Sequence, residues 1–298
     1  MPLSRFSKGL LAAGGAASLW AVGGVTGKVL LTSILSPAQL VFLRSALSTL
    51  VLGLFLLLTQ KPSVKVRASD LPFLACIGIF GLAFTQFTYY AAIQSLPVGL
   101  GILLQYLAPV WILLFEWIGW KLPLTKTKVT AVGLSVCGCG LVSIQNDSGT
   151  SYSAYGVSMG LIAGVCFAAY GLMNRRALRH HADVTVLFYS LLFCTVFWGI
   201  GLLPAGLPWA RMNGVHWAMV WYIALLGTLI PFWLFVRALR YLEASQVGTV
   251  STLEPVLAAA LAWFRLGETL AVSQLVGGML VLMAILTLHQ SSPRKVEE

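Results

Sequence analysis

Charged residues are scarce in this chain. Asp, Glu, Lys and Arg make up 9% of the 298 residues, whereas 58% are hydrophobic and the mean hydropathy is +0.88. A soluble protein of this length needs far more charge to cover its surface. Because long apolar runs recur along the whole chain, most of these side chains must face lipid. The composition therefore predicts an α-helical membrane protein that crosses the bilayer many times.

Metal-binding, redox and catalytic patterns are also missing. The five cysteines all lie inside apolar runs, and Cys137-Gly138-Cys139 has neither zinc nor redox spacing. The chain lacks a Walker-type loop, a His-Glu-x-x-His motif and a Gly-x-Ser-x-Gly motif. His180-His181 does not form the clustered set of acids or histidines that a lipid-modifying enzyme requires. We therefore expect no enzyme activity, no metal and no cofactor.

The net charge of +10 points to membrane topology and not to nucleic acid. The basic residues form no face or arm but punctuate the gaps between apolar runs. With a cytoplasmic N-terminus, 15 of the 19 lie on the cytoplasmic side, and the other four are Lys28, Arg44, Arg211 and Arg265. Because Lys and Arg are enriched in cytoplasmic loops, this asymmetry predicts both termini in the cytoplasm and an even number of spans. The predicted location is a bacterial-type inner membrane.

Apolar runs of about 20 residues are long enough to cross the hydrocarbon core. Counting on that basis predicts ten spans, at residues 10–31, 37–58, 71–94, 98–119, 128–145, 155–173, 183–203, 216–236, 244–264 and 270–289. The first run, preceded by Arg5 and Lys8, is also compatible with a signal peptide. Trp20 and Lys28 extend it beyond a short apolar region, and its removal would leave nine spans. We therefore interpret it as the first helix.

One stretch of sequence occurs twice. Residues 104–110 read LQYLAPV and residues 250–256 read VSTLEPV, so a shift of 146 positions superposes Pro109 on Pro255. An apolar composition produces chance identities, but a proline at the same depth in two apolar spans is a stronger signal. We interpret the pair as an internal repeat with a broken helix in each half.

The repeat and the span count together predict an inverted architecture. Five spans per half is an odd number, so the second half enters the membrane from the opposite side. The predicted fold class is an all-α polytopic membrane protein whose ten transmembrane helices form two inverted five-helix repeats. The predicted parts are a first repeat at 1–146, a second repeat at 155–290 and a cytoplasmic tail at 291–298, with a polar hinge at 146–154.

Glu254 lies at the centre of the ninth span, where a carboxyl group is costly and usually faces a cavity or a partner. It is a candidate proton site or ligand for a substrate amine. The alternative is a structural hydrogen bond or an ion pair, for which Arg44 is the candidate partner. Ala108 occupies the equivalent position of the first half. Four other charged side chains lie near span ends and are expected to reach the membrane surface: Lys28, Glu116, Arg237 and Arg265.

The two prolines predict free hydrogen-bonding groups at the membrane midplane. Pro109 and Pro255 leave the carbonyls of Gln105 and Ser251 without a helical N–H partner. With the polar side chains of Gln105, Tyr106, Ser251 and Thr252, these carbonyls are expected to line a cavity that holds a zwitterion. A simple kink, satisfied by neighbouring helices, is the alternative.

Residues well inside other spans supply the remaining cavity wall. Most tryptophans lie near span ends, as in an interfacial belt, but several aromatic residues do not. Gln86 and Tyr90 share one face of the third span at four-residue spacing. The predicted cavity therefore also includes Trp20, Gln86, Tyr90, Phe167, Tyr170 and Trp233.

The paired Leu-Ala-Pro-Val and Leu-Glu-Pro-Val motifs, the run from Ser251 to Leu270 with Gly267-Glu268, and Arg44 resemble the drug/metabolite transporter superfamily, specifically its EamA-type exporters. The resemblance covers nearly the whole chain. It implies a central cavity between the halves and export by alternating access at prolines 109 and 255. The chain is similar to amino-acid exporters of that family, including aromatic amino-acid exporters.

We therefore expect an exporter of small metabolites, with an amino acid, aromatic ones included, as the substrate and the lipid bilayer as the surroundings. A broad-specificity efflux protein and a non-transporting structural membrane protein are the alternatives.

Overall fold

The structure is a computed structural model that describes residues 4–59, 65–121, 123–143, 153–202, 206–266 and 272–290. These residues form helices and connecting turns, with no strand among them. The α-helices are α1 (Arg5–Ser33), α2 (Pro37–Leu58), α3 (Leu71–Cys76), α4 (Phe84–Ser95), α5 (Val98–Gln105), α6 (Ala108–Trp120), α7 (Lys126–Ser143), α8 (Ala154–Ala177), α9 (Asp183–Leu202), α10 (Gly214–Ala224), α11 (Ile230–Ala238), α12 (Ala244–Ser251), α13 (Leu253–Leu266) and α14 (Val272–Gln290). Short 3₁₀ and π segments are η2 (Ala68–Asp70), η3 (Ile77–Ala83), η4 (Trp209–Arg211) and η5 (Leu225–Leu229).

These pieces form ten rods that coincide with the ten predicted spans, so the fold class is confirmed. Six rods are single helices, and four consist of successive pieces, as in α5–α6 and α12–α13. Local sequence signals set the ends: Ser36 and Gln39 form a capping box around Pro37 at the start of α2. Among the described residues, seven segments are long and apolar enough to cross a membrane: Arg5–Ser33, Pro37–Leu58, Ala68–Ser95, Val98–Trp120, Ala154–Ala177, Asp183–Leu202 and Gly214–Ala238. The predicted tail and nearly all of the predicted hinge lie outside the described residues.

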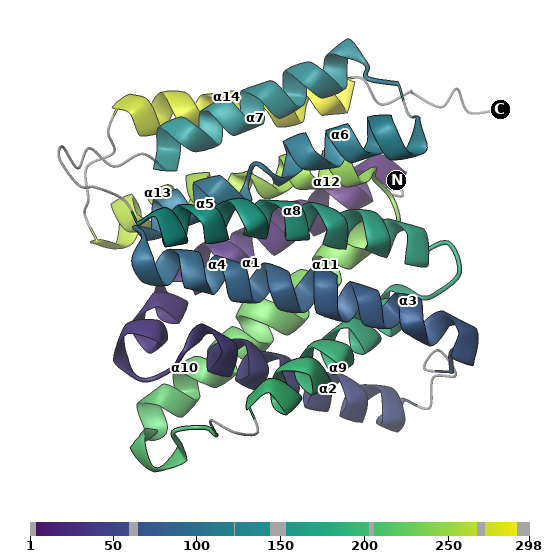
Figure 1. Cartoon of the computed structure of the whole chain (residues 1–298). Helices are drawn as coiled ribbons and strands as arrows, with labels where there is room; N and C mark the ends of the chain where they lie inside the picture. Colours follow the sequence, from purple (N-terminus) through teal and green to yellow (C-terminus); the bar gives the residue numbers. More distant parts are fainter. Residues whose placement is uncertain are drawn as a thin grey trace.

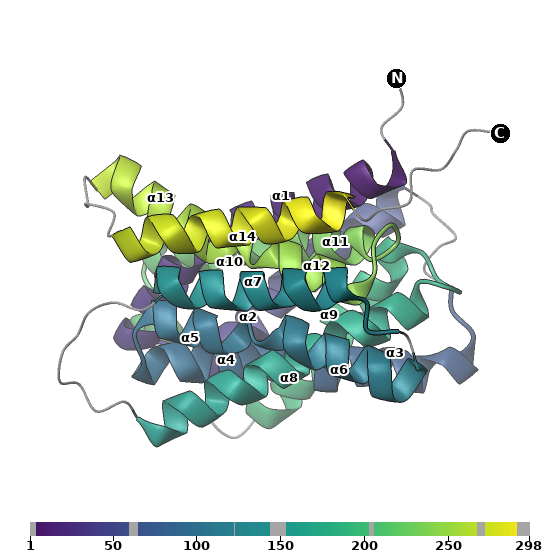
Figure 2. The ribbon, with the colours of Figure 1, turned by 90° about the horizontal axis from the view of Figure 1, so that it is seen from above.

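The rods run side by side, and the first and last helices have their outer ends at the same end of the bundle (Figures 1 and 2). We call this the termini end. Helices α7 and α14 pack together along one side of the bundle (Figure 1). An even number of rods returns the chain to the end where it began.

Both rods that contain the repeated prolines are broken, as the sequence predicts. Helix α5 ends at Gln105 before α6 begins, and α12 ends at Ser251 before α13 begins. Pro109 lies in the first turn of α6, where its missing N–H leaves no carbonyl of α6 unpaired. The Val110 N–H instead bonds the Leu107 carbonyl at 3.0 Å.

The two halves meet symmetrically between α2 and α9. Thr49 and Thr195 are 146 positions apart, and their hydroxyl oxygens lie 3.2 Å apart. Two residues related by the repeat can touch only close to the axis that relates the halves. The pseudo-two-fold axis therefore passes between these helices.

Reciprocal packing on either side of that axis supports its position. A Cβ placed on Gly53 would lie 3.3 Å from Phe188, and one on Gly199 would lie 3.1 Å from Phe42. These are the same contact with the halves exchanged, because both residues of each pair are shifted by 146 positions. Glycine at 53 and 199 lets each helix accept the phenyl ring of the other.

A matching irregularity occurs in the third and eighth rods. The π-helical segments η3 and η5 cover overlapping parts of the repeat, with Gly81 equivalent to Gly227. In η5, the Thr228 hydroxyl donates to the Ile223 carbonyl five residues earlier, at 2.8 Å. An extra residue in a turn rotates the following side chains by about 100° around the helix axis. This rotation decides which aromatic residue of α11 faces inward.

Charged groups near the rod ends do not all behave as expected. Lys28 donates to the carbonyls of Ile93 and Leu96, the latter at 2.9 Å, and so caps the C-terminal end of α4. Glu116 is 1% exposed, and the expectation that it reaches the membrane surface is wrong. Arg237 is exposed, with its guanidinium 5.1 Å from the ring centre of Trp233. The side chain of Arg265 lies outside the description.

Close backbone approach between α7 and α14 gives the first prediction. A Cβ on Gly138 would lie 2.6 Å from the carbonyl oxygen of Gly277, so Gly138→Ala must force the helices apart. We expect a loss of about 1–3 kcal/mol of stability, seen as a lower melting temperature in detergent. Gly133→Ala in the same helix, where a Cβ meets nothing within 4 Å, is the matched control. Equal melting temperatures for the two variants would contradict this packing.

Candidate substrate cavity

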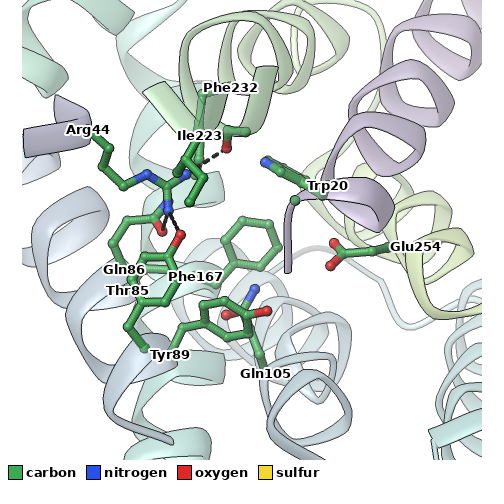
Figure 3. Close-up of a pocket in the computed structure, with 13 residues that line it drawn as sticks. Trp20, Arg44, Thr85, Gln86, Tyr89, Gln105, Phe167, Ile223, Phe232 and Glu254 are labelled. Carbon is green, nitrogen blue, oxygen red and sulfur yellow. Dashed lines mark hydrogen bonds between the residues drawn. The ribbon is translucent and has the colours of Figure 1, made fainter. Parts of the chain in front are cut away.

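A cavity with about 510 Å³ of empty space, part of it open to solvent, is lined by helices of both halves (Figure 3). The lining residues are Trp20 and Gly23 of α1, Arg44 of α2, Thr85, Gln86, Tyr89 and Tyr90 of α4, Gln105 of α5, Phe167 of α8, Ile223 of α10, Gly227 of η5, Phe232 of α11 and Glu254 of α13.

Six of the residues that the sequence suggests for the cavity wall are among them: Trp20, Gln86, Tyr90, Gln105, Phe167 and Glu254. The other five do not line it. Tyr170 is fully buried and stacks on Phe235 with 5.9 Å between ring centres. Ser251 and Thr252 are fully buried and donate to carbonyls of their own helix, those of Val247 at 2.9 Å and Thr249 at 2.7 Å. The break in the ninth rod is thus satisfied locally at these two side chains.

Trp233 lies outside the cavity, and Phe232 takes the place expected for it. The lining residues Ile223 and Gly227 are four positions apart, as in an α-helix, but Phe232 follows five positions after Gly227. The π segment η5 inserts the extra residue and so turns Phe232 inward. With α-helical spacing the next lining residue after Gly227 would be Pro231, and the expectation for Trp233 rested only on its depth in the span.

Arg44 forms the polar side of the cavity. Its side chain is nearly buried, with a residue exposure of 4%. Its guanidinium donates to the Thr228 hydroxyl at 2.6 Å, the Gln86 carbonyl oxygen at 2.8 Å, the Gly227 carbonyl at 2.6 Å and the Tyr90 hydroxyl. All four acceptors are neutral. The guanidinium charge is therefore solvated by dipoles and remains uncompensated.

Glu254 lies on the opposite side of the cavity, with the ring of Phe167 between it and Arg44 (Figure 3). Its Oε2 accepts a hydrogen bond of 2.5 Å from the hydroxyl of Tyr106, which is itself outside the cavity lining. Tyr106 follows the last residue of α5 and Glu254 lies in the first turn of α13, so this bond joins the two broken rods. The ion pair between Arg44 and Glu254, one of the alternatives for these residues, is not formed.

Sequence reasoning missed Thr85, Tyr89, Ile223, Phe232 and two glycines, Gly23 and Gly227. It placed Arg44 only as a partner of Glu254. The internal repeat does point to Phe232, because a shift of 146 positions makes residue 232 equivalent to Gln86, which was predicted to line the cavity. Tyr89 and Thr85 are neighbours of predicted residues on one turn of α4. Gly227 contributes its carbonyl oxygen, which no side-chain pattern reveals.

Among the described residues, no group of three or more His, Cys, Asp and Glu side chains is placed to hold a metal ion. All five cysteines are free thiols. A cavity at the junction of two inverted repeats, beside two broken helices, defines the class as a membrane transporter of small molecules.

The chain belongs to the EamA-like transporter family, whose pattern it matches twice, at residues 7–144 and 154–289. It is 28% identical over 268 residues to an uncharacterized transporter of Archaeoglobus fulgidus, covering 87% of this chain and 93% of that protein. It is 30% identical over 237 residues to the threonine/homoserine exporter RhtA of Escherichia coli K12, covering 78% and 75%. The pseudopaline exporter CntI of Pseudomonas aeruginosa is 26% identical over 267 residues, covering 87% and 88%.

A crystal structure with 18% sequence identity superposes with a TM-score of 0.79 over 96% of this chain and 99% of its own. At this identity the likeness shows the fold alone. The family match identifies this chain as a multi-pass membrane protein of a transporter family.

The Arg44 cluster gives the second prediction. Thr228→Val keeps the shape of the side chain but removes the acceptor of the Arg44 Nε–H, leaving a buried charged donor unpaired. We expect a loss of about 1–3 kcal/mol in stability, measured by thermal unfolding in detergent. Thr287→Val, which removes only an exposed bond to the carbonyl one turn earlier, is the control. Equal melting temperatures for Thr228→Val and Thr287→Val would show that the bond from Arg44 to Thr228 does not stabilise the fold.

Proposed function

We propose that this protein exports amino acids by alternating access, binding them in the cavity between Arg44 and Glu254. The observation that carries the proposal is the placement of one cationic and one carboxyl side chain on opposite sides of a cavity that five aromatic side chains also line. An amino-acid zwitterion has the complementary pair of charges. Such groups recognise each other strongly where water is excluded.

Arg44 is suited to the substrate carboxylate. A guanidinium has five N–H donors, and four acceptors of the protein engage it. No carboxylate among the described side chains pairs with it within 4.0 Å. An incoming carboxylate would supply the missing negative charge while the existing bonds hold the guanidinium in place.

Glu254 is suited to the substrate amine. Tyr106 holds one carboxyl oxygen and leaves the second, Oε1, for another donor. A protonated amine and a proton would compete for this group. Glu254 is therefore also the candidate coupling site if export runs against proton entry.

The aromatic walls suit the substrate side chain. The rings of Trp20 and Phe232 meet edge to face with centres 5.1 Å apart, and Trp20 and Phe167 with centres 6.0 Å apart. This surface would accept the aliphatic part of a threonine or homoserine molecule, the substrates named for RhtA, and also an aromatic side chain. Both kinds of amino acid belong in the substrate screen.

Alternating access would use the breaks at Pro109 and Pro255. The two broken rods are joined at Tyr106 and Glu254, and each can bend where its helical bonds are interrupted. One half would rock against the other and expose the cavity in turn to each side. We place the termini end, which carries most of the Lys and Arg residues, in the cytoplasm of a bacterial inner membrane.

A broader metabolite efflux protein is the second candidate. It is favoured by the different substrates named for the related exporters, threonine and homoserine in one case and pseudopaline in another. A transport screen with purified protein in liposomes separates the candidates. Selective movement of amino acids supports our proposal, equal movement of unrelated metabolites supports the second, and no movement above empty vesicles excludes both.

The third prediction concerns Glu254. If an ionised carboxylate binds the substrate amine, wild-type transport should rise with pH as Glu254 loses its proton and then level off. Glu254→Gln cannot ionise, so its transport should be weak and nearly independent of pH. Tyr106→Phe keeps the carboxyl group and should keep a pH dependence. Transport rates of the three proteins at several pH values test this, and a Glu254→Gln profile parallel to wild type would exclude Glu254 as the coupling group.

A further inference from the structure

Among the described residues, ion pairs occur at one end of the bundle. The described part of the chain holds four, and all of them lie at the termini end: Lys128–Glu243 at 2.5 Å, Arg175–Glu116 at 3.7 Å, His181–Asp70 at 3.5 Å and Arg240–Asp183 at 3.7 Å. The first three each join a residue of the first half to a residue of the second. Contacts of this kind must break if the halves separate at this end.

Glu116 is the most deeply buried member of this set. Its Oε2 accepts a hydrogen bond of 2.9 Å from the Ser245 hydroxyl, and its Oε1 faces Arg175. A buried carboxylate is costly unless charged and hydrogen-bonding partners compensate it. Helix α6 of the first half is thereby tied to α8 and α12 of the second. The nearby Lys128–Glu243 pair ties α7 to the start of α12.

An apolar layer separates this cluster from the cavity. Ile112 lies one turn before Glu116 in α6, and Tyr170 lies five residues before Arg175 in α8. Both are fully buried, and Phe235 stacks on Tyr170. Phe235 also contacts Trp20 and Phe167 of the cavity wall, with ring centres 5.8 Å and 5.1 Å apart. The termini end of the cavity is thus closed first by packed rings and then by charges.

The opposite end has no equivalent of this cluster in its sequence. The repeat places Ala262 and Val29 where the first end has Glu116 and Arg175. It places Gln274 and Pro97 where the first end has Lys128 and Glu243. In an inverted repeat, exchanging the conformations of the two halves moves the closed contacts to the other end. The state closed at that end would therefore lack these ion pairs.

We propose that Glu116, Arg175, Ser245, Lys128 and Glu243 form a gate, which closes the cytoplasmic end of the cavity and opens once in each transport cycle. The ion pairs favour the state that is closed to the cytoplasm, and the gate must open before substrate can enter the cavity from that side. This inference rests on the proposed function for its direction of transport. The gate itself is defined by the contacts between the halves.

Reversible crosslinking tests whether this end must open. In a chain without its five natural cysteines, Glu116→Cys and Ser245→Cys place thiols on opposite sides of the gate. Treatment with a short bis-methanethiosulfonate should abolish amino-acid transport in liposomes, and reductant should restore it. Thr49→Cys with Thr195→Cys is the matched control: this pair also joins the halves, but it lies beside the pseudo-two-fold axis and keeps its contact when the halves exchange conformations.

The outcomes separate the gate from the proposed function. Full transport by the crosslinked Glu116→Cys/Ser245→Cys protein overturns the gate, and so does equal inhibition by the control crosslink. If the protein with its natural cysteines moves no amino acid, the proposed function fails. The next measurement then decides the gate by itself, because it needs no substrate.

Thiol accessibility measures opening directly. A cysteine replacing Ile112, just inside the ion pairs, should react slowly with N-ethylmaleimide in the chain without natural cysteines. Adding Arg175→Gln should raise the rate severalfold, because it removes the cation that faces Glu116. Adding Arg176→Gln should not, since that guanidinium lies over the Phe73 ring, 5.8 Å from its centre. Equal rates with Arg175→Gln and Arg176→Gln would overturn the gate.

Discussion

The buried guanidinium of Arg44 is the constraint on which the cavity depends. Lipid supplies no hydrogen-bond acceptor, so every engaged N–H of this group must find one inside the protein. It finds them on α4 and η5, and in doing so it ties α2 of the first half to the eighth rod of the second. The π turn of η5 presents a backbone carbonyl for this purpose. The same bonds leave a positive charge facing the cavity.

The two halves share a backbone plan but differ in chemistry. Their axis is marked by Thr49 and Thr195, yet Arg44 corresponds to Ser190 and Glu254 to Ala108. The charged cavity groups therefore come one from each half, with no counterpart in the other. In the proposed alternating-access cycle, these differences would make the two end states unequal.

Sequence patterns predicted the elements better than their facing sides. The ten rods and both breaks follow from apolar length and from proline, which act locally. Six of eleven predicted residues line the cavity, whereas Trp233 does not, because depth in a span does not decide which face of the helix a residue occupies. Ser251 and Thr252 do not line the cavity either, because their hydroxyls donate to carbonyls of their own helix. Glu116 was expected at the surface because it lies near a span end, and the partners that bury it, Ser245 and Arg175, are distant in sequence.

The sequence by itself determined the membrane class, the number of rods, the inverted repeat and the positions at which two rods break. These follow from length, hydropathy, charge bias and the missing N–H of proline, which are local properties that can be read directly from the sequence. Only the tertiary structure decided that Arg44 faces neutral acceptors, that Tyr106 and not Arg44 bonds Glu254, and that the ion pairs gather at one end. Partners of buried polar groups are chosen by packing between distant helices, because each group takes whichever acceptor or donor the fold brings within reach.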